Sequence, residues 1–267
     1  MHKVVNELKK RAPAGIEFKD HHTQADLVIS QAIGARCMDR IAATKKPFVV
    51  IQFCVLTAGW ARRADWVRFW RHDRCRLVVS YYEISHLAPR FLLMPLGADF
   101  SLFRPTGGPR PYTIMTSGHH AGQEPIDECH DAAGRVKGQV VHLGGNCYRG
   151  HCPVDRREKI LEGEVARLLA ASKRVSALRW VEGFEMLGIE GLAAGARPVV
   201  FDLPCYRRWY GQHAAYVPHD RSALRESLVS VFRRAPRPVS QEEREALRKR
   251  FSWDSVARTF WKGVQGV

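Results

Sequence analysis

Two glutamates lie in a glycine-rich turn in the second half of the chain. Glu182 and Glu190 stand between two apolar runs, in the stretch EGFEMLGIEGLAAGARPVVFD that begins at residue 182. The second run restarts as a short helix from about Gly188 and stops at Gly195, which predicts a strand, loop, helix and strand in succession. Such a unit opens its loop at the carboxyl edge of a parallel sheet, where ligands bind. We therefore expect this turn to carry a ligand site.

The elements that would position this turn follow a parallel α/β pattern. Short apolar strands are predicted at 26–30, 48–55 and 77–80, after a helix at 4–11. A stretch rich in Pro and Gly follows at 102–111, and it is the best domain boundary in the sequence. Beyond it we predict strands at 112–116, 139–143 and 215–217, helices at 156–172 and 223–233, and a capping box at 240–243 that starts another helix.

This pattern predicts two Rossmann-like lobes, the first of them reduced because the usual opening strand and glycine loop are missing. We place a first lobe at residues 1–104 and a ligand-binding lobe at 105–250. Residues 251–267 are predicted to form a C-terminal helix that packs back on the first lobe.

Composition is that of an ordinary globular protein. The 267 residues are 45% hydrophobic, and no apolar run approaches the roughly 20 residues that span a bilayer. The start lacks the apolar core of a signal peptide, and the seven scattered cysteines favour reduced thiols. We expect a cytoplasmic monomer with no integral membrane segment.

The chain is strongly basic, with 42 Lys and Arg against 27 Asp and Glu and a net charge of +15. This favours a polyanionic partner, either nucleic acid or an anionic membrane surface, although excess arginine also arises from GC-rich coding. Six arginines and three tryptophans gather between Trp60 and Arg76, a composition typical of a nucleic-acid groove. In the alternative, Trp66, Phe69 and Trp70 pack inward and the arginines are only solvated. The candidate nucleic-acid-binding residues are Arg62, Arg63, Trp66, Arg68, Arg71 and Arg74.

A second group of side chains has the chemistry of a zinc site. It comprises Cys129, His130, His142, Cys147, His151 and Cys152. Because their spacing matches no C-x-x-C pattern, incidental thiols are favoured, and we predict no metal.

Three segments resemble the two-lobed GT-B glycosyltransferases, especially family 4. The opening stretch is similar to the family's E-G-F-G-x-x-x-x-E pattern, which is followed by small residues, Gly, Pro and Val-Val. Residues 94–105, MPLGADFSLFRP, resemble its N-G-V-D-x-x-x-F-x-P linker, and residues 251–253, FSW, its closing helix. The three segments occur in the family's order and together span about residues 94–261.

The resemblance implies a nucleotide-sugar donor, most simply a UDP-sugar, and sugar transfer with retention of configuration and without a metal. It places Glu182 by the transferred sugar as the catalytic residue and Glu190 on the nucleotide ribose. Glu190 would lie in the first turn of its helix, where backbone N–H groups face the diphosphate. In the alternative, Glu190 only stabilises the helix N-terminus. The donor-binding residues are then Glu190, Gly183, Phe184, Gly188, Gly118 and His119.

The sequence departs from the family at the phosphates. Glu185 stands where the family has Gly, and the family's G-R-L-x-x-x-K-G clamp is replaced by SGHHAGQE from residue 117, without Arg or Lys. His119, Lys137 or Arg135 are candidate substitutes. In the first lobe Gln52 stands where many relatives carry His.

A compact chain with an arginine-rich first lobe also resembles bacteriophage enzymes that glycosylate modified DNA. We therefore expect transfer to a hydroxylated base in double-stranded DNA, such as 5-hydroxymethylcytosine, in the host cytoplasm. One alternative is a transferase for a lipid-linked or surface glycan at an anionic membrane. The other is a non-catalytic DNA-binding protein on a degenerate transferase fold.

Overall fold

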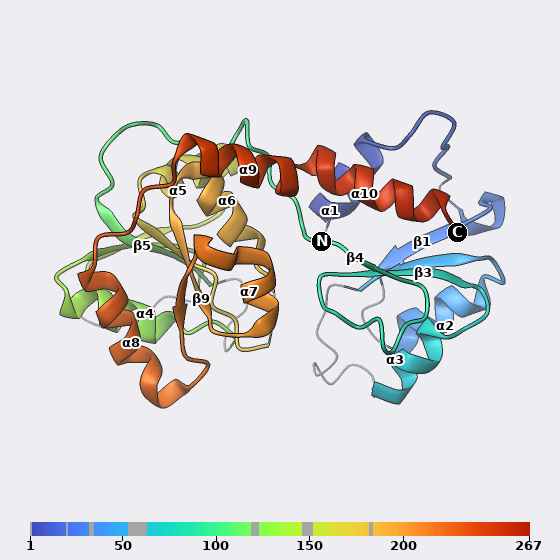
Figure 1. Ribbon diagram of the computed structural model, residues 1–267, viewed down its shortest axis with the longest axis horizontal. Coiled ribbons are helices and arrows are strands. Elements are labelled where there is room, and N and C mark those ends of the chain that lie inside the picture. Colours follow the sequence, from blue (N-terminus) through green and yellow to red (C-terminus); the bar gives the residue numbers. More distant parts are fainter. Residues whose placement is uncertain are drawn as a thin grey trace. The chain divides into compact units, whose positions relative to one another are not determined.

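The computed structural model describes residues 2–19, 21–31, 35–52, 63–118, 123–145, 152–181 and 184–267. Contacts divide the chain into two compact units. Unit 1 comprises Met1–Leu96 and Trp253–Val267, and unit 2 comprises Gly97–Ser252. Each unit contains its own parallel sheet with helices (Figure 1), which confirms the predicted α/β class with two Rossmann-like lobes. The structure thus divides the chain at 96/97 and 252/253, where we had placed boundaries at 104/105 and 250/251.

Unit 1 has a small sheet. In the described residues it holds four parallel strands in the order β1-β2-β3-β4, so the lobe is reduced as predicted. Helices α2 and α3 cover one face, and α1 and α10 cover the other (Figure 1). The elements are α1 (His2–Lys10), β1 (Val28–Gln31), α2 (Ala35–Ala43), β2 (Phe48–Ile51), α3 (Arg63–Trp70), β3 (Cys75–Ser80), β4 (Phe91–Leu93) and α10 (Trp253–Gln265), with a short 3-10 turn at His22–Gln24.

The core of unit 1 is aromatic on the side of α3. Trp66, Phe69 and Trp70 are all buried, and the Phe69 ring stacks on Phe48 of β2 with ring centroids 5.0 Å apart. On the opposite face the indole Nε1 of Trp261 donates a hydrogen bond of 2.9 Å to the carbonyl of Leu8. This bond joins α10 to α1.

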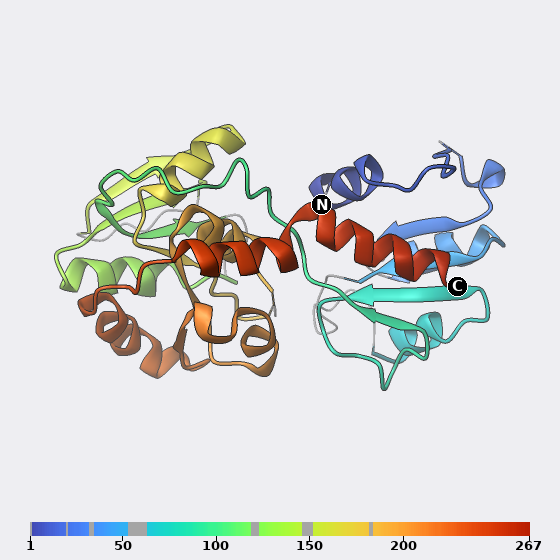
Figure 2. The same cartoon turned by 45° about the horizontal axis from the view of Figure 1, so that its top comes forward.

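Unit 2 is a larger Rossmann-like lobe. Its described strands are all parallel and lie in the order β10-β9-β8-β5-β6-β7. Helices α4 and α8 lie on one face, and α5, α6 and α9 on the other (Figures 1 and 2). The elements are β5 (Tyr112–Ser117), α4 (Ile126–Arg135), β6 (Gln139–Leu143), β7 (Val154–Arg157), α5 (Glu162–Ala170), β8 (Arg174–Ser176), α6 (Met186–Ala194), β9 (Arg197–Phe201), α7 (Pro204–Tyr210), β10 (Ala215–Val217), α8 (Arg221–Arg233) and α9 (Gln241–Phe251).

The strand order contains a reversal between β5 and β8. From β5 the chain proceeds outward through β6 and β7, whereas from β8 it proceeds to the other side through β9 and β10. In open parallel sheets the crevice outside the carboxyl ends of two such strands is where ligands bind. We therefore expect a ligand site at the loops that follow β5 and β8.

One predicted helix in this unit was wrong over its first part. We expected a helix over 156–172, but residues Val154–Arg157 form the edge strand β7 and the helix begins at Glu162. β7 alternates little in polarity, and its pairing with β6 decides its conformation, because strand formation depends on neighbouring strands more than on local propensity.

The described helices include none that is both long enough and apolar enough to cross a membrane.

Candidate donor site at the strand reversal

A buried cluster of charges lies at the reversal between β5 and β8. Arg179 follows β8, and its Nη2 lies 2.8 Å from Oε1 of Glu124, which belongs to the segment after β5. The Nε of the same guanidinium forms an ion pair with Glu185, the residue just before α6. The three side chains are only 6%, 6% and 13% exposed. We call Arg179, Glu124 and Glu185 the charge triad.

The charge triad contains two carboxyl groups and one guanidinium, so negative charge exceeds positive charge when both carboxyl groups are ionised. Burial raises the pKa of Glu124 to about 7, the neighbouring Arg179 opposes this rise, and the charge of Glu185 adds to it. The hydroxyl of Ser117 at the end of β5 also donates a hydrogen bond of 3.0 Å to Glu124. The pKa of Glu124 therefore lies near neutral pH, where this carboxyl gains or loses a proton.

Helix α6 follows the triad and approaches its neighbours closely. A Cβ at Gly188 would lie 2.5 Å from the hydroxyl oxygen of Tyr210, and one at Gly191 would lie 2.4 Å from a methyl carbon of Val175. The helix ends at Gly195, as predicted, in a left-handed conformation with φ of 90°. Gly188, predicted as a donor-binding residue, thus lets α6 pack on buried Tyr210.

Glu190 lies on α6 with only 5% of its surface exposed. The helix begins at Met186, so Glu190 is in its second turn, and the prediction of the first turn was wrong. The helix starts early because Glu185 takes the N-cap position and its carbonyl accepts the Gly188 N–H. A carboxylate beyond the first turn gains little from the helix dipole, which weakens the alternative in which Glu190 only stabilises the helix N-terminus.

The buried hydroxyl of Tyr210 lies at the start of α6. This hydroxyl donates a hydrogen bond to the backbone carbonyl of Glu185. Burial raises the pKa of Tyr210 well above its usual value, and the charges of Glu185 and Glu190 raise it further. Glu190 therefore lies within electrostatic range of this buried hydroxyl at the start of α6.

Two predicted donor-binding residues serve the packing of unit 2. Phe184 is 1% exposed, and its ring contacts those of Trp209, Tyr210 and Phe251. The backbone N–H of Gly118 donates a bond of 2.8 Å to the carbonyl of Leu143, so it is not free to reach a phosphate. Four other predicted residues, Glu182, Gly183, His119 and Arg62, lie outside the described residues.

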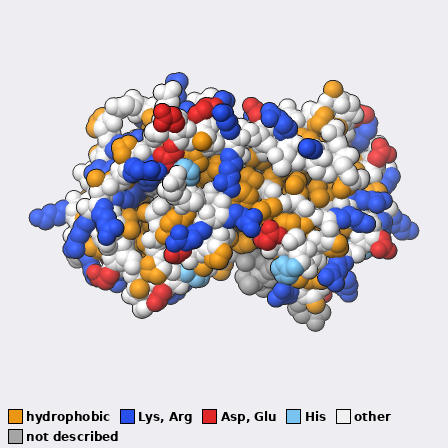
Figure 3. Space-filling model, in the orientation of Figure 1, with side chains coloured by type: hydrophobic (Ala, Val, Ile, Leu, Met, Phe, Trp, Pro, Cys, Tyr) orange, Lys and Arg blue, Asp and Glu red, His pale blue; other side chains and the backbone are white. Residues whose placement is uncertain are grey.

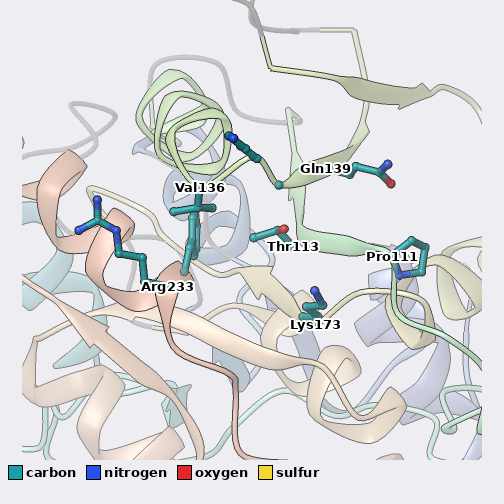
Figure 4. Close-up of a pocket in the computed structure, with 9 residues that line it drawn as sticks. Pro111, Thr113, Val136, Gln139, Lys173 and Arg233 are labelled. Carbon is teal, nitrogen blue, oxygen red and sulfur yellow. The ribbon is translucent and has the colours of Figure 1, made fainter.

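Two of the candidate substitutes for the phosphate clamp, Lys137 and Arg135, lie elsewhere. Lys137 precedes β6 at the amino edge of the sheet, and Arg135 forms an ion pair with Glu226. Lys137 lines an open depression of about 580 Å³ together with Lys173 and Arg233 (Figure 4). Because this depression is at the amino edge, it is separate from the strand reversal at the carboxyl edge, and neither residue can replace the clamp there.

The predicted nucleic-acid-binding residues of unit 1 divide into two groups. Arg63, Arg68 and Arg71 are exposed. Arg74 is half-buried and donates a bond of 3.1 Å to the carbonyl of Ala42. Trp66 is 2% exposed, so its ring belongs to the core and cannot stack on a base, which corrects that assignment. The inward packing of the aromatics is the arrangement observed.

The four candidate zinc ligands that the structure describes do not gather around a metal position. Within the described residues, no group of three or more His, Cys, Asp or Glu side chains could hold a metal ion. His130 and His142 instead lie on either side of the buried hydroxyl of Thr116, at 3.0 and 2.9 Å. Cys147 and His151 fall outside the described residues.

Sequence reasoning missed the charge triad. Arg179 stands three residues before Glu182, just ahead of the glycine-rich stretch, and an arginine inside an apolar run was the available signal. Nothing in the sequence pairs it with Glu124, because that contact depends on the order of the strands. The triad also accounts for Glu185, the departure from the family's Gly, since Arg179 neutralises its carboxylate.

Comparisons with known proteins locate this fold among the sugar transferases. No family model matches the chain, and no curated protein matches its sequence. Among solved structures, HepE from Anabaena in complex with UDP-glucose is similar with a TM-score of 0.74 at 11% identity, covering 99% of this chain and 82% of that one. Sucrose-phosphate synthase from Thermosynechococcus elongatus is similar with a TM-score of 0.67 at 13% identity, covering 90% and 73%. The pneumococcal O-GlcNAc transferase GtfA in complex with UDP and GlcNAc has a TM-score of 0.63 at 13% identity, covering 90% and 56%. The protein therefore has the GT-B fold of these glycosyltransferases.

Proposed function

We propose that the protein is a glycosyltransferase that takes a sugar from a nucleotide-sugar donor, most simply a UDP-sugar. The observation that carries this proposal is the buried Glu190, which follows the strand reversal of unit 2 on the helix that begins beside the charge triad. The fold likeness supports it, since HepE was solved with UDP-glucose and GtfA with UDP and GlcNAc.

In this proposal the two glutamates have separate tasks. The carboxylate of Glu190 accepts hydrogen bonds from the ribose hydroxyls, which fixes the nucleotide at the edge of the sheet. Glu182 meets the transferred sugar, and the acceptor hydroxyl is held against the anomeric carbon while the diphosphate leaves. Transfer with retention of configuration follows from the family resemblance.

We further propose a polyanionic acceptor, namely double-stranded DNA that carries a hydroxylated base such as 5-hydroxymethylcytosine. The net charge of +15 and the exposed arginines of α3 and β3 support this choice. Basic side chains are also spread over both units in the face shown in Figure 3, with fewer acidic ones among them. Transfer to a base requires that the base leave the stack.

The function is tested by incubation with a panel of nucleotide sugars and with duplexes that contain cytosine or 5-hydroxymethylcytosine. Digestion to nucleosides and mass spectrometry should show a mass gain of one hexose on the hydroxylated base only. A mass gain on no duplex would refute the DNA acceptor, whereas hydrolysis of a nucleotide sugar without any duplex would still support the donor half. Flotation with acidic liposomes but no retention on DNA would favour a membrane glycan as acceptor.

The arginines of unit 1 should determine DNA affinity. Replacing Arg63, Arg68 and Arg76 by Gln should weaken duplex binding and reduce the slope of log affinity against log salt by about 2 to 3, since each lost phosphate contact removes about 0.9. Fluorescence anisotropy over a salt series measures this slope. The matched control replaces three arginines of unit 2 that are paired with carboxylates, Arg135, Arg167 and Arg248, and changes the net charge equally. Equal slopes for the two variants would show that charge alone, and not this surface, binds the duplex.

A further inference from the structure

The charge triad joins three parts of the proposed donor site. Arg179 and Glu185 bound the segment 179–185, here called the donor loop, and their ion pair ties its two ends together. Glu124 comes from the other side of the strand reversal, so its contact with Arg179 fixes the donor loop to the segment after β5. Glu182 lies within this loop in the sequence. One buried guanidinium thus contacts both the segment after β5 and the residue just before α6.

The charge of the triad conflicts with that of the proposed ligand. With both carboxylates ionised the triad carries a net negative charge, and the diphosphate of a nucleotide sugar carries a negative charge on each phosphate. Like charges at a site of low effective dielectric repel strongly, and a proton on one carboxylate removes the excess. Glu124 is the member that accepts it, because burial raises its pKa to about 7.

Within the part of the chain that the structure describes, the other groups near the triad can be told apart. Ser117 donates to Glu124, and Tyr210 donates to the backbone of Glu185. Glu190 lies on α6, buried Cys129 lies on α4 within range of the Glu124 charge, and the ring of His219 contacts the carbonyl of Trp180 in the donor loop at 3.0 Å. Burial raises the pKa of Cys129 to about 12, so its thiol does not titrate near neutral pH. His219 therefore needs its own control.

We propose that the charge triad positions the described ends of the donor loop, residues 179–181 and 184–185, and that binding of the donor's diphosphate is coupled to uptake of a proton by Glu124. The inference rests on the proposed function, because it assumes a donor at this site. The proton moves from solvent to a carboxylate oxygen of Glu124, and no other bond forms or breaks. Glu124 and Glu185 act through Arg179 and are positioning residues.

The test is calorimetric titration with UDP-glucose, whose diphosphate is esterified at both ends and does not titrate near pH 7. Titrations in two buffers of different ionisation enthalpy give the number of protons taken up. We expect uptake of about half a proton at pH 7 and close to one at pH 8, with affinity about tenfold weaker at pH 8 than at pH 6. The sign follows from the raised pKa, because the binding-competent protonated form is lost as the pH rises through about 7.

Substitutions identify the group that takes up the proton. Glu124→Gln imitates the protonated carboxyl and should bind UDP-glucose with no proton uptake and with the same affinity at pH 6 and pH 8. Glu185→Gln removes the excess negative charge at the other carboxylate and should also abolish the proton uptake. The proposal can therefore still be tested if one of the two variants does not fold. Asp127→Asn, at an exposed carboxylate three residues beyond Glu124, and His219→Asn should behave as the wild type.

Each outcome separates this inference from the proposed function. Binding by the wild type without proton uptake, or uptake that persists in Glu124→Gln, overturns the coupling and leaves the transferase proposal intact. Loss of the uptake in His219→Asn alone assigns the proton to the histidine and also overturns it. Failure of the wild type to bind any nucleotide sugar overturns the proposed function and this inference with it.

Discussion

Replacement of Arg179 by Met is expected to lower the free energy of unfolding by about 3–5 kcal/mol at pH 7.5, the usual loss when one partner of a buried ion pair is removed. The guanidinium is 6% exposed and lies between the carboxylates of Glu124 and Glu185. Without it, two carboxylates remain close together away from water, and both charge repulsion and desolvation oppose folding. Urea unfolding followed by circular dichroism measures the loss.

Two further variants separate a buried from a surface effect. Arg207→Met removes an ion pair with Asp202 whose partners are 56% and 44% exposed, and it should cost less than about 1 kcal/mol. Addition of Glu124→Gln and Glu185→Gln to Arg179→Met should recover much of the lost stability, because no buried charge is then left without its partner. If Arg179→Met is no more destabilising than Arg207→Met, the triad is not a buried structural element.

The Glu190→Ala variant is expected to weaken UDP-glucose binding by at least about 100-fold. A carboxylate that accepts hydrogen bonds from both ribose hydroxyls contributes about 1.5–3 kcal/mol for each bond, and the alanine variant loses both of them. Calorimetric titration at pH 6, where most of the protein is in the protonated, binding-competent form of the proposed coupling, gives the affinity. Glu190 is buried, so circular dichroism must first show that the variant keeps its fold.

A matched variant provides the comparison for Glu190. Glu245 forms an ion pair with Arg248 on the surface of α9, and Glu245→Ala should bind the donor like the wild type. Glu190→Gln should lie between the two, because its amide oxygen still accepts a hydrogen bond but carries no charge. Unchanged affinity in a folded Glu190→Ala protein would exclude Glu190 as the ribose ligand.

Local rules in the sequence predicted those parts of the fold that depend on neighbours in the chain. The end of α6 at Gly195 follows from the left-handed conformation that glycine adopts readily. The start of α9 follows from Ser240, whose hydroxyl accepts the Glu243 N–H at 3.1 Å. The parallel α/β class follows from the short apolar strands.

Other parts of the fold could not be predicted from the sequence, because contacts between residues far apart in the chain determine them. The short strands β4, β7 and β8 and the helix α7 carry little periodicity, and their partners in the sheet or core make them regular. The triad unites residues from loops on both sides of the strand reversal, so its prediction needs the strand order. The resemblance located Glu190 on its helix, but the start of that helix depends on packing against Tyr210.

The separation of unit 1 into Met1–Leu96 and Trp253–Val267 has a consequence for biosynthesis. The hydrogen bond from Trp261 to the carbonyl of Leu8 forms only after the 252 residues between them have been translated. The residues of unit 2 leave the ribosome as one continuous segment and fold as a block. The sheet of unit 1 emerges first but waits for α10, so in the nascent protein the face that α10 covers stays exposed until residues 253–267 have been translated.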